Sequence, residues 1–325
     1  MARFSRNPTF AFFLALLFAL PLSESSSAPK KRQRMVIRGD KPLPAELAED
    51  GDAPAKPKMP RKFHLLAEGE LPLKAGGAVV IDGLTGRTLY GKNAEAPQYP
   101  ASTTKIMTAL LVIEAGDLDR IVEIGPEEAA VGESSLDVRV GERYARREML
   151  YGLMLKSAND VAHALARDNA GTMEAFALKM TRRAQELGAR STSFKNPHGL
   201  HHVEHFTTPQ DLALITRAAM AQPFFRKVVS TVKHRWVRPS EPPQPRDLGN
   251  HNRLLTAFEG CTGVKTGFTR PAQHTLASAA LRGRREVIAV VMHDGKLEKW
   301  EDSKLLLTYG LDHPPGDTPT KITGN

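Results

Sequence analysis

The sequence predicts an α+β fold in which one antiparallel sheet is flanked by helices. Strand-like runs lie at both ends of the folded part: GAVVID at residues 77–82, and two apolar runs, 274–280 and 287–292. The last two flank the polar string LRGRRE, which is typical of a hairpin. Helical patterns fill the middle of the chain. Strands at the two ends that enclose a helical middle indicate that the terminal strands share one antiparallel sheet.

The other elements follow from local turn and cap signals. Residues 83–86 predict a turn, and residues 87–90 predict a second strand. Pro100 precedes the apolar string STTKIMTALLVIEAG, which predicts a helix ending at Gly116. Because residues 238–248 hold four prolines, we expect an exposed loop there. Further helices are expected at 146–155, 160–168, 173–187, 209–221 and 297–309, and a strand at CTGVKTGFT, residues 261–269.

Composition bounds the class of protein. The chain has 325 residues, of which 41% are hydrophobic and 25% charged, enough for a sizeable core. This composition excludes a wholly disordered chain and a collagen-like repeat. Because Cys261 is the one cysteine, neither an intrachain disulfide nor a cysteine-based zinc cluster is expected. The net charge of +9 favours an anionic partner such as nucleic acid, a membrane surface or an acidic polymer.

The N-terminal part is expected to hold a targeting segment and a linker. Two arginines precede an apolar run at residues 10–22, which small and polar residues follow. This order is typical of a secretory signal peptide, here residues 1–28, and an uncleaved anchor is the alternative. Residues 29–70 hold six prolines and a basic run, so we interpret them as a basic, proline-rich linker. Export argues against nucleic acid as a partner. A weak association with a membrane surface or an anionic wall polymer stays open.

The first motif with chemical meaning is S-x-x-K, formed by Ser102 and Lys105 at an expected helix start. Residues i and i+3 share a helix face, so the hydroxyl and the amine can meet. A serine hydroxyl is a weak nucleophile until a base takes its proton, and an ordinary lysine is protonated at pH 7. Burial and a second cation would lower the pKa of Lys105 enough for it to act as that base.

The second motif is S-x-N, formed by Ser157 and Asn159 between two expected helices. Its hydroxyl could relay a proton to a leaving group. Its amide could fix a substrate carbonyl or hold Lys105 in place.

The third motif is K-T-G at residues 265–267, inside an expected strand. Lys265 could supply the second cation and attract a substrate carboxylate, which the Thr266 hydroxyl could also bind. Gly267 leaves room for a peptide to lie against the strand edge. The three motifs are separated by 55 and 108 residues, and each lies on the type of element that its chemistry needs.

Serine β-lactamases and penicillin-binding proteins carry these three motifs in this order. The sequence resembles the low-molecular-mass penicillin-binding proteins, the serine-type D-alanyl-D-alanine carboxypeptidases, in a single-domain form. The resemblance runs from about Ala75 to His313 and includes the strings AVVIDGLTGRTLYGKNAEAPQYPASTTKIMTALL, KSANDVA, NPHGLHHVEHFTTPQDLALI, NHNRLL and GVKTGFT. It implies a serine β-lactamase/transpeptidase-like fold, with a D,D-peptidase catalytic domain at residues 71–325.

The resemblance also implies a role for each motif residue. As catalytic residues, Ser102 would form the acyl-enzyme with Lys105 as its general base. Ser157 would pass the proton to the departing D-alanine, and Asn159 would orient the substrate. Backbone N–H groups of Ser102 and Phe268 would form an oxyanion hole. The substrate-binding residues would be Lys265, Thr266, Gly267 and Phe268, the first two holding the terminal carboxylate.

Two departures from the family pattern concern substrate contacts. Many relatives carry a histidine after K-T-G, where this chain has Phe268. Relatives often carry an arginine before the last helix that helps to bind carboxylate. The nearest counterparts here are Lys299 and Lys296.

The implied activity is removal of the terminal D-alanine from peptidoglycan stem peptides through an acyl-enzyme, in the periplasm or cell wall. The partners would be a stem peptide ending in D-Ala-D-Ala and, as covalent inhibitors, β-lactams. We expect no cofactor and no metal. The dense histidine cluster at residues 198–205 is interpreted as structural, because the family chemistry needs no metal.

Three alternatives stay open. A D,D-endopeptidase that cuts peptidoglycan cross-links shares the acylation chemistry and differs in its acceptor-side pocket. A class A β-lactamase needs a glutamate in E-x-x-L-N, a string that is absent between Ser157 and Lys265, and Ala158 replaces the aspartate of S-D-N. A non-catalytic wall-binding protein would keep the fold without the chemistry.

Overall fold

A five-stranded antiparallel sheet lies at the centre of the fold. The structure is a computed structural model that describes residues 70–313. The strands are β1 (Gly77–Asp82), β2 (Thr88–Lys92), β7 (Cys261–Thr269), β8 (Gln273–Arg282) and β9 (Arg285–Asp294). Their order in the sheet is β2-β1-β9-β8-β7, and β1 pairs antiparallel with β9. The expectation that strands from both ends share one antiparallel sheet is confirmed.

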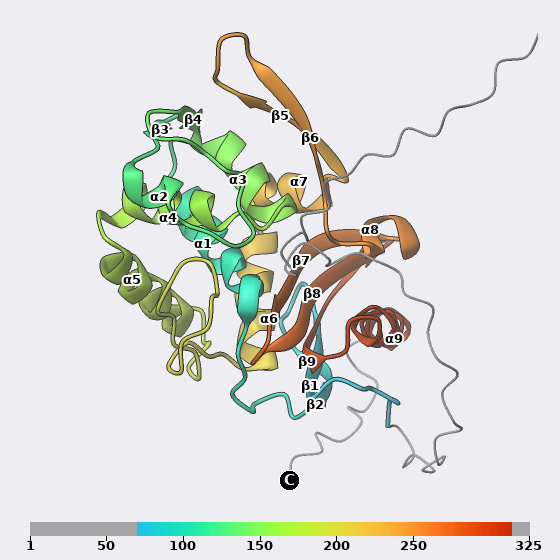
Figure 1. The fold of residues 1–325 in the computed structure, drawn as a ribbon. Helices are drawn as coiled ribbons and strands as arrows, with labels where there is room; N and C mark the ends of the chain where they lie inside the picture. The colour runs from blue at the N-terminus through green and yellow to red at the C-terminus, as the bar shows by residue number, and fades with distance from the viewer. Residues whose placement is uncertain (1–69, 314–325) are drawn as a thin grey trace, which may run out of the picture. The chain divides into compact units, whose positions relative to one another are not determined.

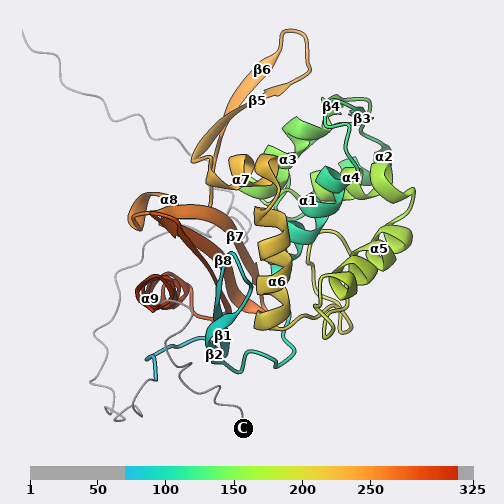
Figure 2. The ribbon, with the colours of Figure 1, turned by 180° about the vertical axis from the view of Figure 1, so that it is seen from behind.

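Helices cover both faces of this sheet. Helix α9 (Glu298–Asp312) packs on one face, and α6 (Pro209–Met220) lies on the other (Figures 1 and 2). Alternate residues of β1 separate accordingly, because successive side chains of a strand point to opposite faces. Val80 packs in the apolar cluster of α9, and Val79 packs in the cluster of the other helices. The whole of β1 is therefore buried, as in a sheet covered on both sides.

The helical part begins with a short 3-10 turn that leads into the first helix. This turn is η1 (Ala101–Thr104), followed by α1 (Lys105–Glu114), whose residues from Lys105 to Val112 are all buried. The other helices are α2 (Pro126–Ala129), α3 (Arg146–Leu155), α4 (Asn159–Ala170), α5 (Met173–Glu186), α7 (Pro223–Ser230) and α8 (Leu254–Ala257). In the first turn of α6, the Thr208 hydroxyl accepts a hydrogen bond from the Asp211 N–H, and Pro209 occupies the first helical position. Most of the expected helices are confirmed to within a few residues.

One expectation is wrong: residues 238–248 are not simply an exposed loop. They form most of a projecting hairpin between β5 (Lys233–Arg238) and β6 (Gln244–Gly249) (Figure 1). Three of the four prolines lie in the connection at residues 239–243. The fourth, Pro245, lies in a two-stranded ribbon, where a residue without an N–H can face away from the partner strand.

A second short ribbon, between β3 (Ile121–Glu123) and β4 (Arg143–Ala145), lies beside α3 and α4. No helix between residues 70 and 313 combines the length and the apolar character needed to cross a membrane. The expected signal peptide (1–28) and all but the last residue of the expected linker (29–70) lie outside the described residues.

Candidate active site

Ser102 and Lys105 meet at the start of α1, as the S-x-x-K spacing predicts. The Lys105 Nζ atom donates a hydrogen bond to Ser102 Oγ over 3.2 Å. The preceding turn is fixed to the sheet, because the Pro100 carbonyl accepts hydrogen bonds from the hydroxyls of Thr103 and Thr275. Thr275 lies on β8, so this contact holds the nucleophile candidate against the sheet.

Lys105 is fully buried and has three oxygen neighbours from three parts of the chain. Besides Ser102 Oγ, its Nζ donates to Asn159 Oδ1 and to the His198 carbonyl, each over 2.7 Å. Burial lowers the pKa of Lys105 well below its usual value. The nearby cation of Lys265 lowers this pKa further, and the Asp160 carboxylate raises it. Among the described residues no carboxylate bonds the amine directly, so burial shifts the amine toward its neutral form.

The S-x-N motif lies at the start of α4 in a strained turn. Ser157 has a φ of 62°, in the left-handed region that residues other than glycine seldom adopt. Its hydroxyl is buried and has no hydrogen-bond partner among the described residues. Asn159 is fixed on its far side by the Glu133 carbonyl, which accepts from Nδ2 over 2.8 Å. The Asn159 N–H donates to the Ser134 carbonyl over 2.8 Å.

The loop that holds Asn159 is itself fixed by the next residue of α4. We call residues 133–139 the clamp loop. The buried Asp160 carboxylate accepts hydrogen bonds from Ser135 Oγ (2.6 Å), the Leu136 N–H (3.0 Å) and the Val138 N–H (3.2 Å). Sequence reasoning assigned no role to Asp160. The available signal was an acidic residue directly after S-x-N, in the first turn of a helix.

The K-T-G motif lies on β7, which packs against the 3-10 turn η1 that holds Ser102. Lys265 is buried, its Nζ donates to the Thr266 carbonyl over 2.9 Å, and burial lowers its pKa to about 7. A Cβ on Gly267 would lie 2.4 Å from Thr275 Oγ1 and 2.9 Å from the Ser102 nitrogen. Only glycine therefore lets β7 approach the backbone N–H of Ser102 so closely. The Phe268 side chain is 45% exposed at the end of this strand.

Lys299 contacts a residue that pairs with this strand, which the sequence alone could not show. It is in the first turn of α9, mostly buried, and its Nζ lies 3.0 Å from His274 Nδ1. His274 pairs with Phe268 across β7 and β8, with ring centroids 4.5 Å apart. Burial, with the cations of Arg253 and Lys296, lowers the pKa of Lys299 to about 8. Lys299 therefore reaches the K-T-G strand through His274.

The clustered histidines have separate structural contacts. His205 Nδ1 accepts from the Lys195 N–H, so its Nε2 carries the proton and donates to Thr104 Oγ1 over 2.8 Å. Burial lowers the pKa of both His205 and His198 to about 3, which keeps both rings neutral. His201 and His202 are exposed. Among residues 70–313, no group of three or more His, Cys, Asp or Glu side chains is placed to hold a metal ion.

A serine hydroxyl beside a buried lysine amine is compatible with serine acyl transfer. Comparison with known proteins gives the family. The family model for D-alanyl-D-alanine carboxypeptidases matches residues 66–296. The chain belongs to this family. The crystal structure of the Streptomyces K15 DD-transpeptidase is similar to it, with a TM-score of 0.71 and 32% identity, over 75% of this chain and 99% of that one. The α+β fold of the penicillin-binding protein type is thereby confirmed.

Several curated members of the family are similar in sequence. The D-alanyl-D-alanine carboxypeptidase DacF of Bacillus subtilis is 37% identical over 68% of this chain and 58% of its own length. DacB2 of Mycobacterium tuberculosis, also named a D-alanyl-D-alanine carboxypeptidase, is 32% identical over 75% of this chain and 85% of its own length. The D-alanyl-D-alanine endopeptidase of Pseudomonas aeruginosa is 31% identical over 72% of this chain and 76% of its own length. The match thus spans little more than half of the Bacillus relative and most of the other two.

Proposed function

We propose that this protein is a penicillin-sensitive serine D,D-carboxypeptidase that releases the terminal D-alanine from peptidoglycan stem peptides. Membership of the carboxypeptidase family supports the peptidase class. The single observation that carries the proposal is the buried Lys105 amine, held between Ser102 Oγ and Asn159 Oδ1. An amine with a lowered pKa beside a hydroxyl is the arrangement that activates a serine nucleophile.

In the proposed acylation step, Ser102 Oγ attacks the carbonyl carbon of the penultimate D-alanine. Neutral Lys105 takes the hydroxyl proton while it still donates to Asn159 Oδ1 and the His198 carbonyl. The bond from carbonyl carbon to the terminal amide nitrogen then breaks. The proton returns through the Ser157 hydroxyl to the leaving amine, which departs as D-alanine. Water, activated by the Lys105 amine, then hydrolyses the acyl-enzyme ester and restores Ser102.

The transition state needs donors for its negative oxygen and an anchor for the substrate carboxylate. The backbone N–H groups of Ser102 and Phe268 are the proposed oxyanion donors, and the tight approach permitted by Gly267 supports this role. Lys265 and Thr266 are the proposed carboxylate ligands. Lys299 is placed to strengthen the positive field at the same end of β7.

We also propose that the enzyme acts outside the cytoplasm, in the periplasm or cell wall. The support is the apolar run at residues 10–22 behind two arginines, together with the D-alanyl-D-alanine carboxypeptidase family to which the chain belongs. A weak association of the basic residues near the N-terminus with a membrane surface or an anionic wall polymer belongs to the same proposal.

The test is release of D-alanine from a diacyl peptide that ends in D-Ala-D-Ala, measured for the wild type and for Ser102→Ala. We expect release by the wild type and none by the variant. An uncross-linked and a cross-linked muropeptide are digested in parallel. Loss of terminal D-alanine supports the carboxypeptidase. Conversion of dimers to monomers without that loss would identify an endopeptidase, the activity for which the Pseudomonas relative is named.

A further inference from the structure

A tight turn outside the three motifs bonds directly to the start of α1. We call residues 196–200 the carbonyl turn. The Lys105 Nζ atom donates to its His198 carbonyl over 2.7 Å. On the same face of the helix, Thr108 Oγ1 donates to its Pro197 carbonyl over 2.6 Å. The turn therefore presents two consecutive carbonyls to α1, and one of them bonds the proposed general base.

The side chain of Asn196 closes this turn. Its Oδ1 accepts hydrogen bonds from the N–H groups of His198 (3.3 Å) and Gly199 (2.7 Å). Its Nδ2 donates to the Leu200 carbonyl over 2.9 Å. An asparagine side chain that bonds the backbone a few residues further on forms a local turn in this way. Asn196 therefore sets the shape of the carbonyl turn.

One peptide group links Asn196 to Lys105. The His198 carbonyl and the Gly199 N–H belong to the same planar peptide group, and in a trans peptide they point in opposite directions. Asn196 Oδ1 holds the N–H end, and Lys105 Nζ holds the carbonyl end. Gly199 has a φ of 89°, and a Cβ there would lie 1.8 Å from the Ala101 carbonyl oxygen, so this peptide group lies close against η1. Without Asn196 the peptide group can rotate and take its carbonyl away from Lys105.

The carbonyl matters because the Lys105 amine has fewer donors when it is neutral. The ammonium form has three N–H groups, which match the three oxygens around it: Ser102 Oγ, Asn159 Oδ1 and the His198 carbonyl. The neutral amine has two N–H groups and one lone pair. The amide oxygen and the carbonyl oxygen can only accept, so they take the two N–H groups, and the lone pair faces Ser102 Oγ. If the carbonyl is lost, an N–H group can turn toward Ser102 instead.

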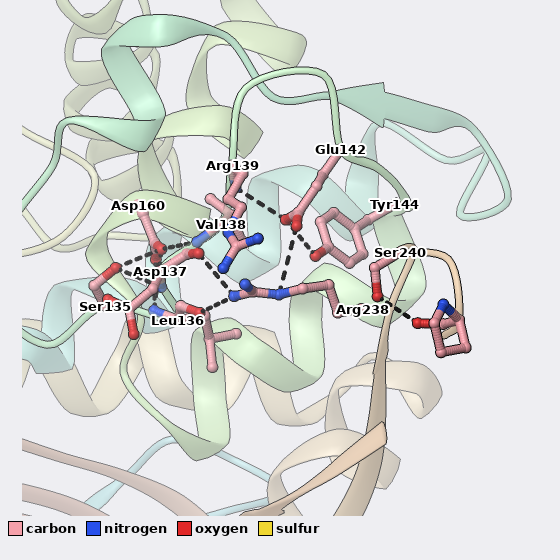
Figure 3. Close-up of polar contacts among 11 residues, drawn as sticks. Ser135, Leu136, Asp137, Val138, Arg139, Glu142, Tyr144, Asp160, Arg238 and Ser240 are labelled. Atoms are coloured by element: carbon pink, nitrogen blue, oxygen red, sulfur yellow. Dashed lines mark hydrogen bonds and ion pairs between the residues drawn. The ribbon is translucent and has the colours of Figure 1, made fainter. Parts of the chain in front are cut away.

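Charged and titratable groups face Lys105 from several sides. Lys265 on β7 lowers the pKa of the amine, and Asp160 on α4 raises it. The Asp160 carboxylate is itself bonded by the clamp loop, as Figure 3 shows. The rings of His198 and His205 are neutral, because burial lowers their pKa values to about 3. Within residues 70–313 the amine itself bonds uncharged oxygens, so these oxygens determine its orientation.

We propose that Asn196 is a positioning residue for the acylation step: it fixes the peptide group that turns the lone pair of neutral Lys105 toward the Ser102 hydroxyl. The inference rests on the proposed function and deepens it, because it adds a residue outside the three motifs to the support of the general base. When Ser102 attacks, its O–H bond breaks and a new N–H bond forms on Lys105. The resulting ammonium then has an acceptor for each of its three N–H groups.

Asn196→Ala tests this role through the rate constant for acylation by benzylpenicillin, measured as a function of pH. Because the base loses its orientation, the maximal rate constant should fall by about 10- to 100-fold. The His198 carbonyl also stabilises the ammonium form of Lys105, since hydrogen bonds from a charged donor are the stronger ones. Its loss should therefore move the rising limb of the profile to lower pH by about one unit. Asn196→Ser keeps a weaker side-chain acceptor for the turn and should recover part of both effects.

Thr181→Val is the matched control. The Thr181 hydroxyl accepts from the Phe194 N–H over 2.9 Å and donates to the Phe194 carbonyl over 3.4 Å, so it holds the chain just before the carbonyl turn. Its loss should lower the thermal midpoint and keep both the maximal rate constant and the rising limb of the wild type. A rising limb that stays in place in Asn196→Ala would overturn the proposal. So would an equal shift in Thr181→Val.

A second readout needs no reaction and separates this proposal from the proposed function. The pKa of Lys105 is measured by NMR of isotope-labelled lysine side chains, with its signal assigned by the loss of that signal in Lys105→Arg. If the wild type releases no D-alanine, or takes up no penicillin, the proposed function fails and this titration still decides the role of Asn196. A pKa that falls in Asn196→Ala and recovers in part in Asn196→Ser supports the role. An equal pKa in the wild type and both variants refutes it.

Discussion

At the scale of single residues, the site depends on two buried lysines with different tasks. In the proposed mechanism, Lys105 must be neutral to take a proton, whereas Lys265 must be charged to attract a carboxylate. Burial lowers the pKa of both, that of Lys265 to about 7. The charge of Lys265 also lowers the pKa of Lys105, so the two tasks support each other.

The pH dependence of kcat/KM follows from these two pKa values. The rate should rise as Lys105 loses its proton, at a pH far below 10.5, the usual pKa of a lysine. It should fall as pH passes about 7, where Lys265 loses its charge in the free enzyme. Lys265→Arg keeps the cation at all these pH values, so the falling limb should move to higher pH. The readout is the position of the two limbs of the pH–rate profile for D-alanine release, independent of the maximal rate.

The rising limb serves as the internal control for this variant. It should stay in place, since the guanidinium would still lower the pKa of Lys105. A falling limb that stays near pH 7 in Lys265→Arg would contradict the assignment.

The sequence could predict the local part of this site and not the long-range part. Ser102 and Lys105 are three residues apart, so helix geometry alone brings them together. The His198 carbonyl reaches Lys105 from 93 residues away, and only the folded chain shows that contact. Gly267 was expected to make room for a peptide. The structure shows that it also makes room for the backbone of Ser102.

At the scale of elements, the clamp loop links the start of α4 to the hairpin. On one side Asp160 holds it through three hydrogen bonds, and on the other side Arg238 holds two of its carbonyls. Neither contact was predicted, because the proline-rich stretch was interpreted as a loop and Asp160 was given no role. The hairpin accommodates those prolines because three of them lie in its connection, and Trp236 packs it against Tyr144.

We expect Asp160→Asn to affect catalysis in two ways. An amide cannot accept all three hydrogen bonds equally well, so the clamp loop and with it Asn159 should lose order. This should lower kcat/KM by about 10- to 100-fold, the effect of a misplacement of about 1 Å. The carboxylate also raises the pKa of Lys105, so the rising limb of the pH–rate profile should move to lower pH. The measurement is that profile together with the thermal midpoint.

Asp168→Asn is the matched control on the same helix. Asp168 forms ion pairs with Arg120 and Arg146 and has no contact with the clamp loop among those described. It should reduce stability and leave the rising limb unchanged. If both variants only lower stability, Asp160 has a purely structural role and the prediction fails.

At the scale of the whole molecule, the site forms where two layers meet. The S-x-x-K and S-x-N residues come from the helical layer, and the K-T-G residues come from the sheet. The antiparallel sheet, the flanking helices and the order of the motifs could all be predicted from the sequence, because periodicity and motif spacing are local properties. Which helices cover which face depends on packing between distant segments, and it required the structure.

The central claim is that this meeting point is a competent acyl-transfer site with Ser102 as its nucleophile. The most direct measurement is the intact mass of the protein after incubation with benzylpenicillin, beside Ser102→Ala. A β-lactam presents a strained amide and a carboxylate in the arrangement of D-Ala-D-Ala, so it should acylate the same hydroxyl. We predict one stable penicillin adduct on the wild type and none on the variant. An adduct that persists in Ser102→Ala, or a wild type that neither binds nor hydrolyses penicillin, would contradict the account.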